Sequence, residues 1–163
     1  MSDSASSSLN AFQQWILKSF GSLGVEVASE VDPLGLEFES EGRIVRVLPH
    51  TDAALAVLQA EVSSLEGADE LSLARIAILM LRLNDEARFE HQWQITLDVD
   101  DRLCISMQIN IAETNAEQLA ELLQEGLERA AMLGDSFPEL TALVAEASSP
   151  ESAHLGSSGL VRG

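Results

Sequence analysis

The chain offers few residues whose type and spacing could support catalysis. Its single cysteine is Cys104, and its three histidines, His50, His91 and His154, stand in unrelated contexts without the spacing of metal ligands. Acidic residues occur throughout the sequence, so a pair of carboxylates does not indicate an acid–base site. We therefore expect a protein that is not an enzyme and that binds no metal and no other cofactor.

Three aspartates, Asp98, Asp100 and Asp101, superficially resemble a calcium-binding loop. They lack the glycine and the distal glutamate of an EF-hand loop, so we interpret them as turn residues. The sequence also lacks a glycine-rich phosphate loop and a Gly-x-Ser-x-Gly nucleophile elbow. With catalysis unsupported, the remaining interpretation is a protein that acts through a binding surface.

The charge of the chain restricts its partners. Lysine and arginine number 9 against 27 aspartates and glutamates, which gives a formal net charge of -18 at pH 7. Such a chain is repelled by nucleic acids and by anionic membranes, so we expect neither as a partner. Basic or neutral protein surfaces and positively charged flexible segments are the partners that this charge favours.

Composition predicts one folded domain over residues 9–147, between a disordered serine-rich leader at 1–8 and a disordered tail at 148–163 rich in Ser, Gly and Pro. The end of that tail resembles a protease-site tag, and a native tail is the alternative. The first residues lack the features of a secretory signal, and no run of about 18 apolar residues suggests a membrane span. These features predict a cytoplasmic protein without membrane insertion.

The most apolar segment is residues 71–83, which read LSLARIAILMLRL. Its composition favours a helix. Leu71, Ala74, Ile78 and Leu81 share one side of that helix, and other apolar residues spread over the opposite side. A helix that is apolar nearly all round is buried on several sides. Either a second copy of the chain covers it, as in a homodimer, or it is a central core helix.

Hydrophobic spacing predicts the other elements. A helix is expected over 9–23, a β-hairpin over 35–48, and a helix over 52–65 capped by Thr51. A second hairpin is expected over 93–111, with Val99 opposite Leu103 and a three-residue loop at 100–102. A last helix should begin at 114 or 115 and end at Gly134, with a further helical piece at 139–147 after Pro138. The predicted fold class is α+β: an antiparallel sheet flanked by N-terminal, central and C-terminal helices.

Glutamates at positions 113, 117, 121 and 125 form an acidic ridge along the last predicted helix. Such a ridge is typical of a solvated helix face. It also leaves an alternative function open, in which the chain is an acidic inhibitor or immunity protein that binds a basic enzyme or mimics nucleic acid.

The order of elements resembles the small acidic chaperones of bacterial type III secretion, in the dimeric class that binds effectors. The resemblance covers roughly residues 9–140, and its strongest local match is Leu81-Arg-Leu-Asn84 leading into residues 93–99. Within that family the chain is also similar to the multi-cargo export-control chaperones of plant-associated bacteria. The family has a third strand before its central helix, where this sequence predicts the helix 52–65.

The resemblance implies a homodimer that binds the N-terminal, non-globular segment of an effector and keeps it competent for export. It leaves open a contact with the secretion ATPase. The positions expected to contact the client are Phe12, Trp15, Ile16, Phe38, Val45, Val47, Trp93, Ile95 and Leu97. Those expected at the dimer interface are Leu71, Ile76, Leu79, Met80 and Leu83. For every one of these positions, the alternative is an ordinary core residue.

Overall fold

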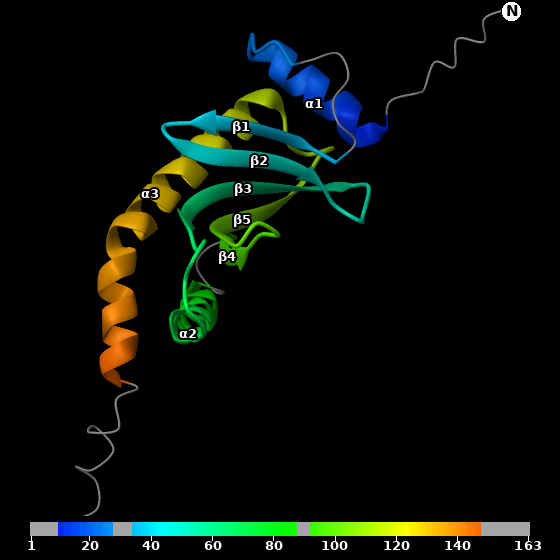
Figure 1. Cartoon of the computed structure of the whole chain (residues 1–163). Helices are drawn as coiled ribbons and strands as arrows, with labels where there is room; N and C mark the ends of the chain where they lie inside the picture. The colour runs from blue at the N-terminus through cyan, green and yellow to red at the C-terminus, as the bar shows by residue number, and fades with distance from the viewer. Residues whose placement is uncertain (1–9, 28–33, 88–91, 148–163) are drawn as a thin grey trace, which may run out of the picture.

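The computed structural model describes residues 10–27, 34–87 and 92–147, so the predicted leader and tail lie outside the described residues. In chain order the elements are α1 (Ala11–Ser22), β1 (Leu36–Ser40), β2 (Arg43–Pro49), β3 (Leu55–Ser64), α2 (Glu70–Ala87), β4 (Gln94–Leu97), β5 (Arg102–Asn110) and α3 (Ala116–Ala147) (Figure 1). The strands form one antiparallel sheet in the order β1-β2-β3-β5-β4. The predicted α+β class is confirmed.

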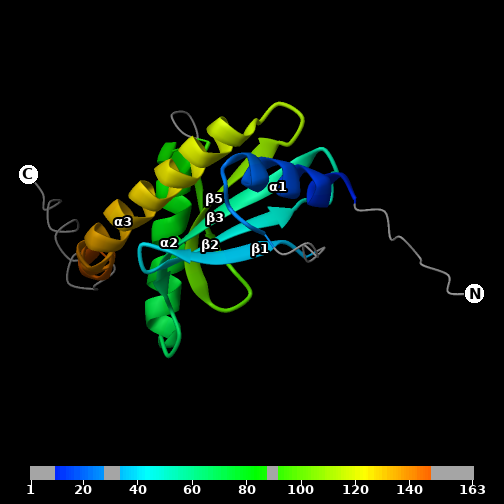
Figure 2. The ribbon, with the colours of Figure 1, turned by 90° about the horizontal axis from the view of Figure 1, so that it is seen from above.

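The core lies between one face of the sheet and the helices. Figures 1 and 2 show α1 and α3 over the same face of the sheet, while α2 lies near the β4 edge. Buried side chains of this core alternate along the two central strands: Ala56, Leu58, Ala60 and Val62 on β3, and Leu103, Ile105, Met107 and Ile109 on β5. The opposite face of the sheet carries polar residues such as Arg46, Gln59 and Gln108 beside the half-buried Leu48 and Val57. Within the described chain, no helix is long and apolar enough to cross a membrane.

The helix α1 confirms the prediction for residues 9–23. Asn10 begins it with a capping box, in which its side chain accepts a hydrogen bond from the Gln13 backbone and the Gln13 side chain accepts one from the Asn10 backbone. The indole N–H of Trp15 donates to the carbonyl of Thr114, at 3.1 Å, just before α3 begins. This hydrogen bond ties the first helix to the start of the last one.

The hairpin of β1 and β2 confirms the prediction for residues 35–48. Glu41 and Gly42 form its two-residue turn with φ values of 53° and 73°. Positive φ at both positions is the geometry whose twist matches the flanking strands. Phe38 of β1 packs edge-on against Phe20 of α1, with ring centroids 6.1 Å apart.

The prediction of a helix over residues 52–65 is wrong, because this segment contains the strand β3. The sequence contains both patterns: apolar residues three or four apart, and an alternation in which alanines fill half of the buried positions. Alanine has a low strand propensity, which conceals the alternation. Pairing with β2 on one side and β5 on the other decides the outcome. Thr51 therefore caps no helix; the Asp52 side chain instead accepts the N–H of Ala54, at 3.0 Å.

The second hairpin is confirmed, but its register differs by two residues from the prediction. Leu97, rather than Val99, lies opposite Leu103, and Val99 projects into solvent at 97% exposure. The Asp98 side chain fixes this loop by accepting the backbone N–H groups of Asp100 and Arg102, each at 2.9 Å. A shift of two residues preserves the face of every side chain, so hydrophobic alternation alone does not distinguish the two registers.

The helix α3 is longer than predicted, because it continues through Gly134 and Pro138 to Ala147. A Cβ atom at position 134 would lie 3.3 Å from the Arg43 guanidinium and 3.3 Å from the carbonyl of Val62. Gly134 therefore does not end the helix; its lack of a side chain allows α3 to pack closely against Arg43 of β2 and Val62 of β3. Past this point, Phe137 and Pro138 line a surface pocket together with Ser72, Arg75 and Ile76 of α2.

Candidate functional site

The residue types that carry metal-binding or nucleophilic chemistry lie apart from one another among the described residues. This part of the chain contains no group of three or more histidine, cysteine, aspartate or glutamate side chains that could hold a metal ion. Cys104 is buried in β5, and burial raises the pKa of its thiol to about 12. Because the thiolate is the nucleophile, this cysteine is unreactive near neutral pH. His50 accepts the backbone N–H of Asp52, at 3.0 Å, and so serves the β2–β3 turn.

Six of the predicted client-binding residues are buried in the fold of the single chain. Their exposed fractions are 9% or less: Phe12, Trp15, Ile16, Val45, Val47 and Trp93. Those from α1 face the sheet, where Phe12 and Trp15 lie 6.2 Å apart between ring centroids. A charged substitution at these positions would therefore disrupt folding before it reported on binding.

The other three predicted client-binding residues are at least partly accessible. Phe38 and Ile95 are half-buried beside the core, and Leu97 is 43% exposed on β4. Phe38 lies on the edge strand β1 and the other two on the edge strand β4. The structure therefore divides these three accessible residues between the two opposite edges of the sheet.

The predicted dimer residues divide between the two sides of α2. Ile76 and Leu79 are buried against the chain's own core, Met80 and Leu83 are half-buried, and Leu71 is 60% exposed. Sequence reasoning omitted Ile78 and Leu81, which are 41% and 73% exposed. Their spacing from Leu71 places them on the same side of the helix, so the sequence contains the pattern that identifies them as exposed apolar residues. The stripe made of Leu71, Ala74, Ile78 and Leu81 is hereafter the outer face of α2.

An apolar groove of about 470 Å³ lies where the end of α2, the edge strand β4 and the middle of α3 meet. Its lining residues are Leu83, Asn84, Trp93, Ile95, Ile105, Arg129, Met132, Leu133, Ser136 and Leu140. Met132 on its rim is 71% exposed, and Arg129 is held by Glu125 at 2.7 Å. The indole N–H of Trp93 is buried and has no hydrogen-bond partner. Sequence reasoning found Trp93 and Ile95 but not the contribution of α3, because distant chain segments meet here.

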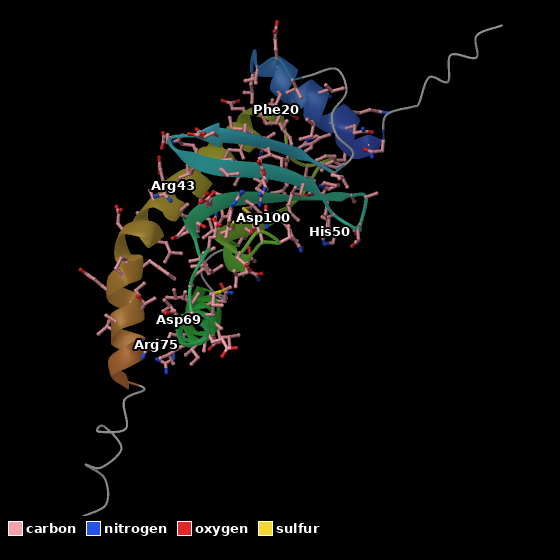
Figure 3. All side chains as sticks on the ribbon, viewed as in Figure 1. Phe20, Arg43, His50, Asp69, Arg75 and Asp100 are labelled. Carbon is pink, nitrogen blue, oxygen red and sulfur yellow. The ribbon has the colours of Figure 1, made fainter. Side chains whose placement is uncertain are left out.

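On the opposite face of the sheet, a group of charged residues gathers around Arg46 of β2. Its guanidinium contacts the carboxylates of Glu37, Asp98 and Asp100, so residues from β1 and from the β4–β5 loop meet there. Figure 3 shows Asp100 on this side of the strands, away from Phe20 of α1. Burial disfavours the charged forms of both Arg46 and Asp98, but their hydrogen bonds have the larger effect. The bonds to Glu37 and Asp98 raise the pKa of Arg46. The bonds from the Arg102 N–H and from Arg46 lower the pKa of Asp98. Asp98 and Asp100 thus hold the hairpin loop through Arg46 and through the backbone N–H groups of the loop.

The acidic ridge faces solvent, but Glu113 lies in the turn before α3, so only its other three glutamates lie on the helix. Glu113, Glu117 and Glu121 are exposed, while Glu125 forms an ion pair with Arg129. Among the described residues, no cation other than Arg129 forms an ion pair with the ridge. The arrangement matches an ordinary solvated helix face.

This fold matches that of solved type III secretion chaperones. The strand β3 occupies the segment for which the sequence predicted a helix and for which the resemblance implied a third strand. No family model matches the chain, and no curated protein sequence matches it either.

Solved structures supply the similarity. The chain superposes on a structure of the Yersinia pestis type III secretion chaperone SycH in complex with a fragment of YscM2, with TM-score 0.53 and 21% identity over 75% of this chain and 98% of the other. A chain of the ExsC–ExsE complex gives TM-score 0.60 and 17% identity over 78% and 96%. A chain of the HopA1–SchA chaperone–effector complex gives TM-score 0.50 and 11% identity over 72% and 88%. The comparisons give no support to an inhibitor or immunity protein.

Proposed function

We propose that this protein is a type III secretion chaperone of the bacterial cytoplasm, which binds the N-terminal, non-globular segment of an effector and keeps it competent for export. The single observation that most supports this function is the fold, which it shares with SycH and with the HopA1–SchA chaperone–effector complex. The net charge of -18 keeps such a chain soluble while apolar side chains remain accessible.

The apolar groove and the sheet edges are the surfaces that suit an extended client. A segment that wraps around the protein places apolar side chains in the groove beside Ile95 and Met132, and its backbone pairs with a strand. Ordering a flexible segment costs about 2–5 kcal/mol or more, so a large contact area has to offset it. Of the predicted client-binding residues, Phe38, Ile95 and Leu97 are those that can contact a client without opening the core.

The outer face of α2 is the proposed homodimer interface. Leu71 and Leu81 expose more than half of their surface on a soluble protein, and a second copy would cover both. Ile76 and Leu79 then support the interface from within the core.

Co-expression with effectors encoded beside a secretion system tests the function. We expect one effector to co-purify with two copies of this protein, and limited proteolysis to leave an N-terminal effector segment protected. Alteration of the groove by Met132→Asp should weaken this complex, whereas Val99→Asp on the exposed hairpin loop serves as a matched control. Effectors that never co-purify, or that bind through a folded domain alone, would refute the proposal.

A further inference from the structure

The strand β4 is one of the two edges of the sheet, and its outward backbone groups can be identified from its pairing. The N–H of Asp98 donates to the carbonyl of Arg102, at 3.0 Å. In an antiparallel pair, residues alternate between hydrogen-bonded and non-hydrogen-bonded positions. Ile95 and Leu97 therefore direct their N–H and C=O groups away from β5. Such groups at a bare edge pair readily with another chain.

The side chain of Asn84, near the end of α2, occupies the first of these two positions. Its Nδ2 donates to the carbonyl of Ile95 at 2.8 Å, and its Oδ1 accepts the N–H of Ile95 at 2.7 Å. A carboxamide presents the same donor and acceptor as a peptide group. Asn84 therefore forms the same two hydrogen bonds with the backbone of Ile95 that a residue of a sixth strand would form.

We infer that Asn84 closes the β4 edge to strand addition and so directs an added client strand to the opposite edge, β1. This inference rests on the proposed function. The strand β4 has four residues, and with Ile95 occupied, Leu97 alone retains outward backbone groups. One residue is too few for a ladder, since successive bonds to an edge come from alternate residues.

The strand β1 has two such positions. Its tight turn makes Ser40 and Arg43 a hydrogen-bonded pair, so the outward backbone groups belong to Glu37 and Glu39. Among the residues that the structure describes, no side chain or backbone group forms a hydrogen bond with the outward backbone groups of β1. The exposed carboxylates of Glu37 and Glu39 lie on the polar face, while Phe38 between them faces α1. Directly opposed residues share a face, so the strand that fits alternates basic and apolar side chains.

The experiment uses the full-length protein and a nitroxide-labelled ten-residue peptide of alternating lysine and valine. In the unaltered protein we expect NMR broadening of the Glu37 and Glu39 amides and none at Leu97. Asn84→Leu should add broadening at Ile95 and Leu97 and should accelerate hydrogen exchange of the Ile95 amide at least tenfold. Asn84→Asp, which keeps the acceptor for the Ile95 N–H, should give a smaller acceleration and remains informative if the leucine variant folds poorly.

Arg82→Leu is the matched control, because it adds the same side chain at an exposed position of the same helix and leaves Asn84 intact. It should behave like the unaltered protein. A peptide that reaches β4 while Asn84 is present, or that leaves β1 unbroadened, would overturn the inference, as would an Ile95 amide that stays protected in both Asn84 variants. Since no effector enters this experiment, its failure is distinguishable from a failure to capture effectors.

Discussion

The outer face of α2 gives the sharpest prediction: Leu81→Asp should convert a dimer into a folded monomer. Leu81 is 73% exposed in the single chain, so the substitution removes little that the fold depends on. Fully burying a leucine contributes about 1.5–3 kcal/mol, so covering the exposed part of Leu81 contributes roughly 1–2 kcal/mol per protomer.

Twofold symmetry doubles this effect, because the same residue is altered on both sides of an isologous interface. The expected loss is therefore about 2–4 kcal/mol before the cost of burying a carboxylate, which raises the dissociation constant of the dimer by at least about 30-fold. Light scattering across a dilution series would measure it. Circular dichroism should show an unchanged fold.

Val25→Asp is the matched control, since Val25 is a 48% exposed apolar residue after α1, and we expect it to leave the dimer intact. Two results would refute the reasoning. One is an unaltered protein that is monomeric at high concentration. The other is a Leu81→Asp variant that dimerises as tightly as the unaltered protein, which would place the interface elsewhere.

Three further substitutions test the fold beneath the binding surfaces. Ile16 is fully buried in α1, so Ile16→Ala should lower the free energy of unfolding by about 2–5 kcal/mol in urea titrations. Gly126→Ala should destabilise the protein by about 1–3 kcal/mol and alter Trp93 fluorescence, because the added Cβ would lie 2.8 Å from the buried indole; Gly21→Ala, with open space around it, should not. The folded pKa of Asp98 is lowered, so its contribution to stability is full above its unfolded pKa of about 3.9 and is lost as pH falls through the folded value. Asp98→Asn should remove that part of the pH dependence of unfolding, and an unchanged acid transition would contradict its role in holding the loop.

Sequence patterns predicted the elements whose local and tertiary preferences agree. The hydrophobic residues follow one clear spacing in each of three such elements: the helix α1, the Glu41-Gly42 hairpin and the strand β5. The strand β3 does not, because its helix-favouring composition conflicts with the pairing that it meets on both sides. The pairing with both neighbouring strands, of which β5 is distant in sequence, resolves that conflict.

The candidate site was predictable in kind but not in detail. Large apolar residues such as Phe12 and Trp15 qualify equally as core or as binding residues, and the packing of α1 on the sheet assigns them to the core. The groove beside Ile95 requires α3, which joins it through residues about forty positions away. Asn84 belonged to the strongest sequence match, yet its contact with Ile95 depends on how α2 packs beside β4.

Charge and apolar exposure point to the same surface of α2. A chain with net charge of -18 repels its own copies, so a second copy can approach only where acidic residues are sparse. From Leu71 to Asn84 the sequence contains no aspartate or glutamate, and its charged residues are Arg75 and Arg82. At physiological ionic strength, salt screens the repulsion between charges more than about 8 Å apart. The apolar contact between two copies therefore has to overcome only a weakened repulsion. Low acidic charge and apolar exposure thus both favour the outer face of α2 as the proposed dimer interface.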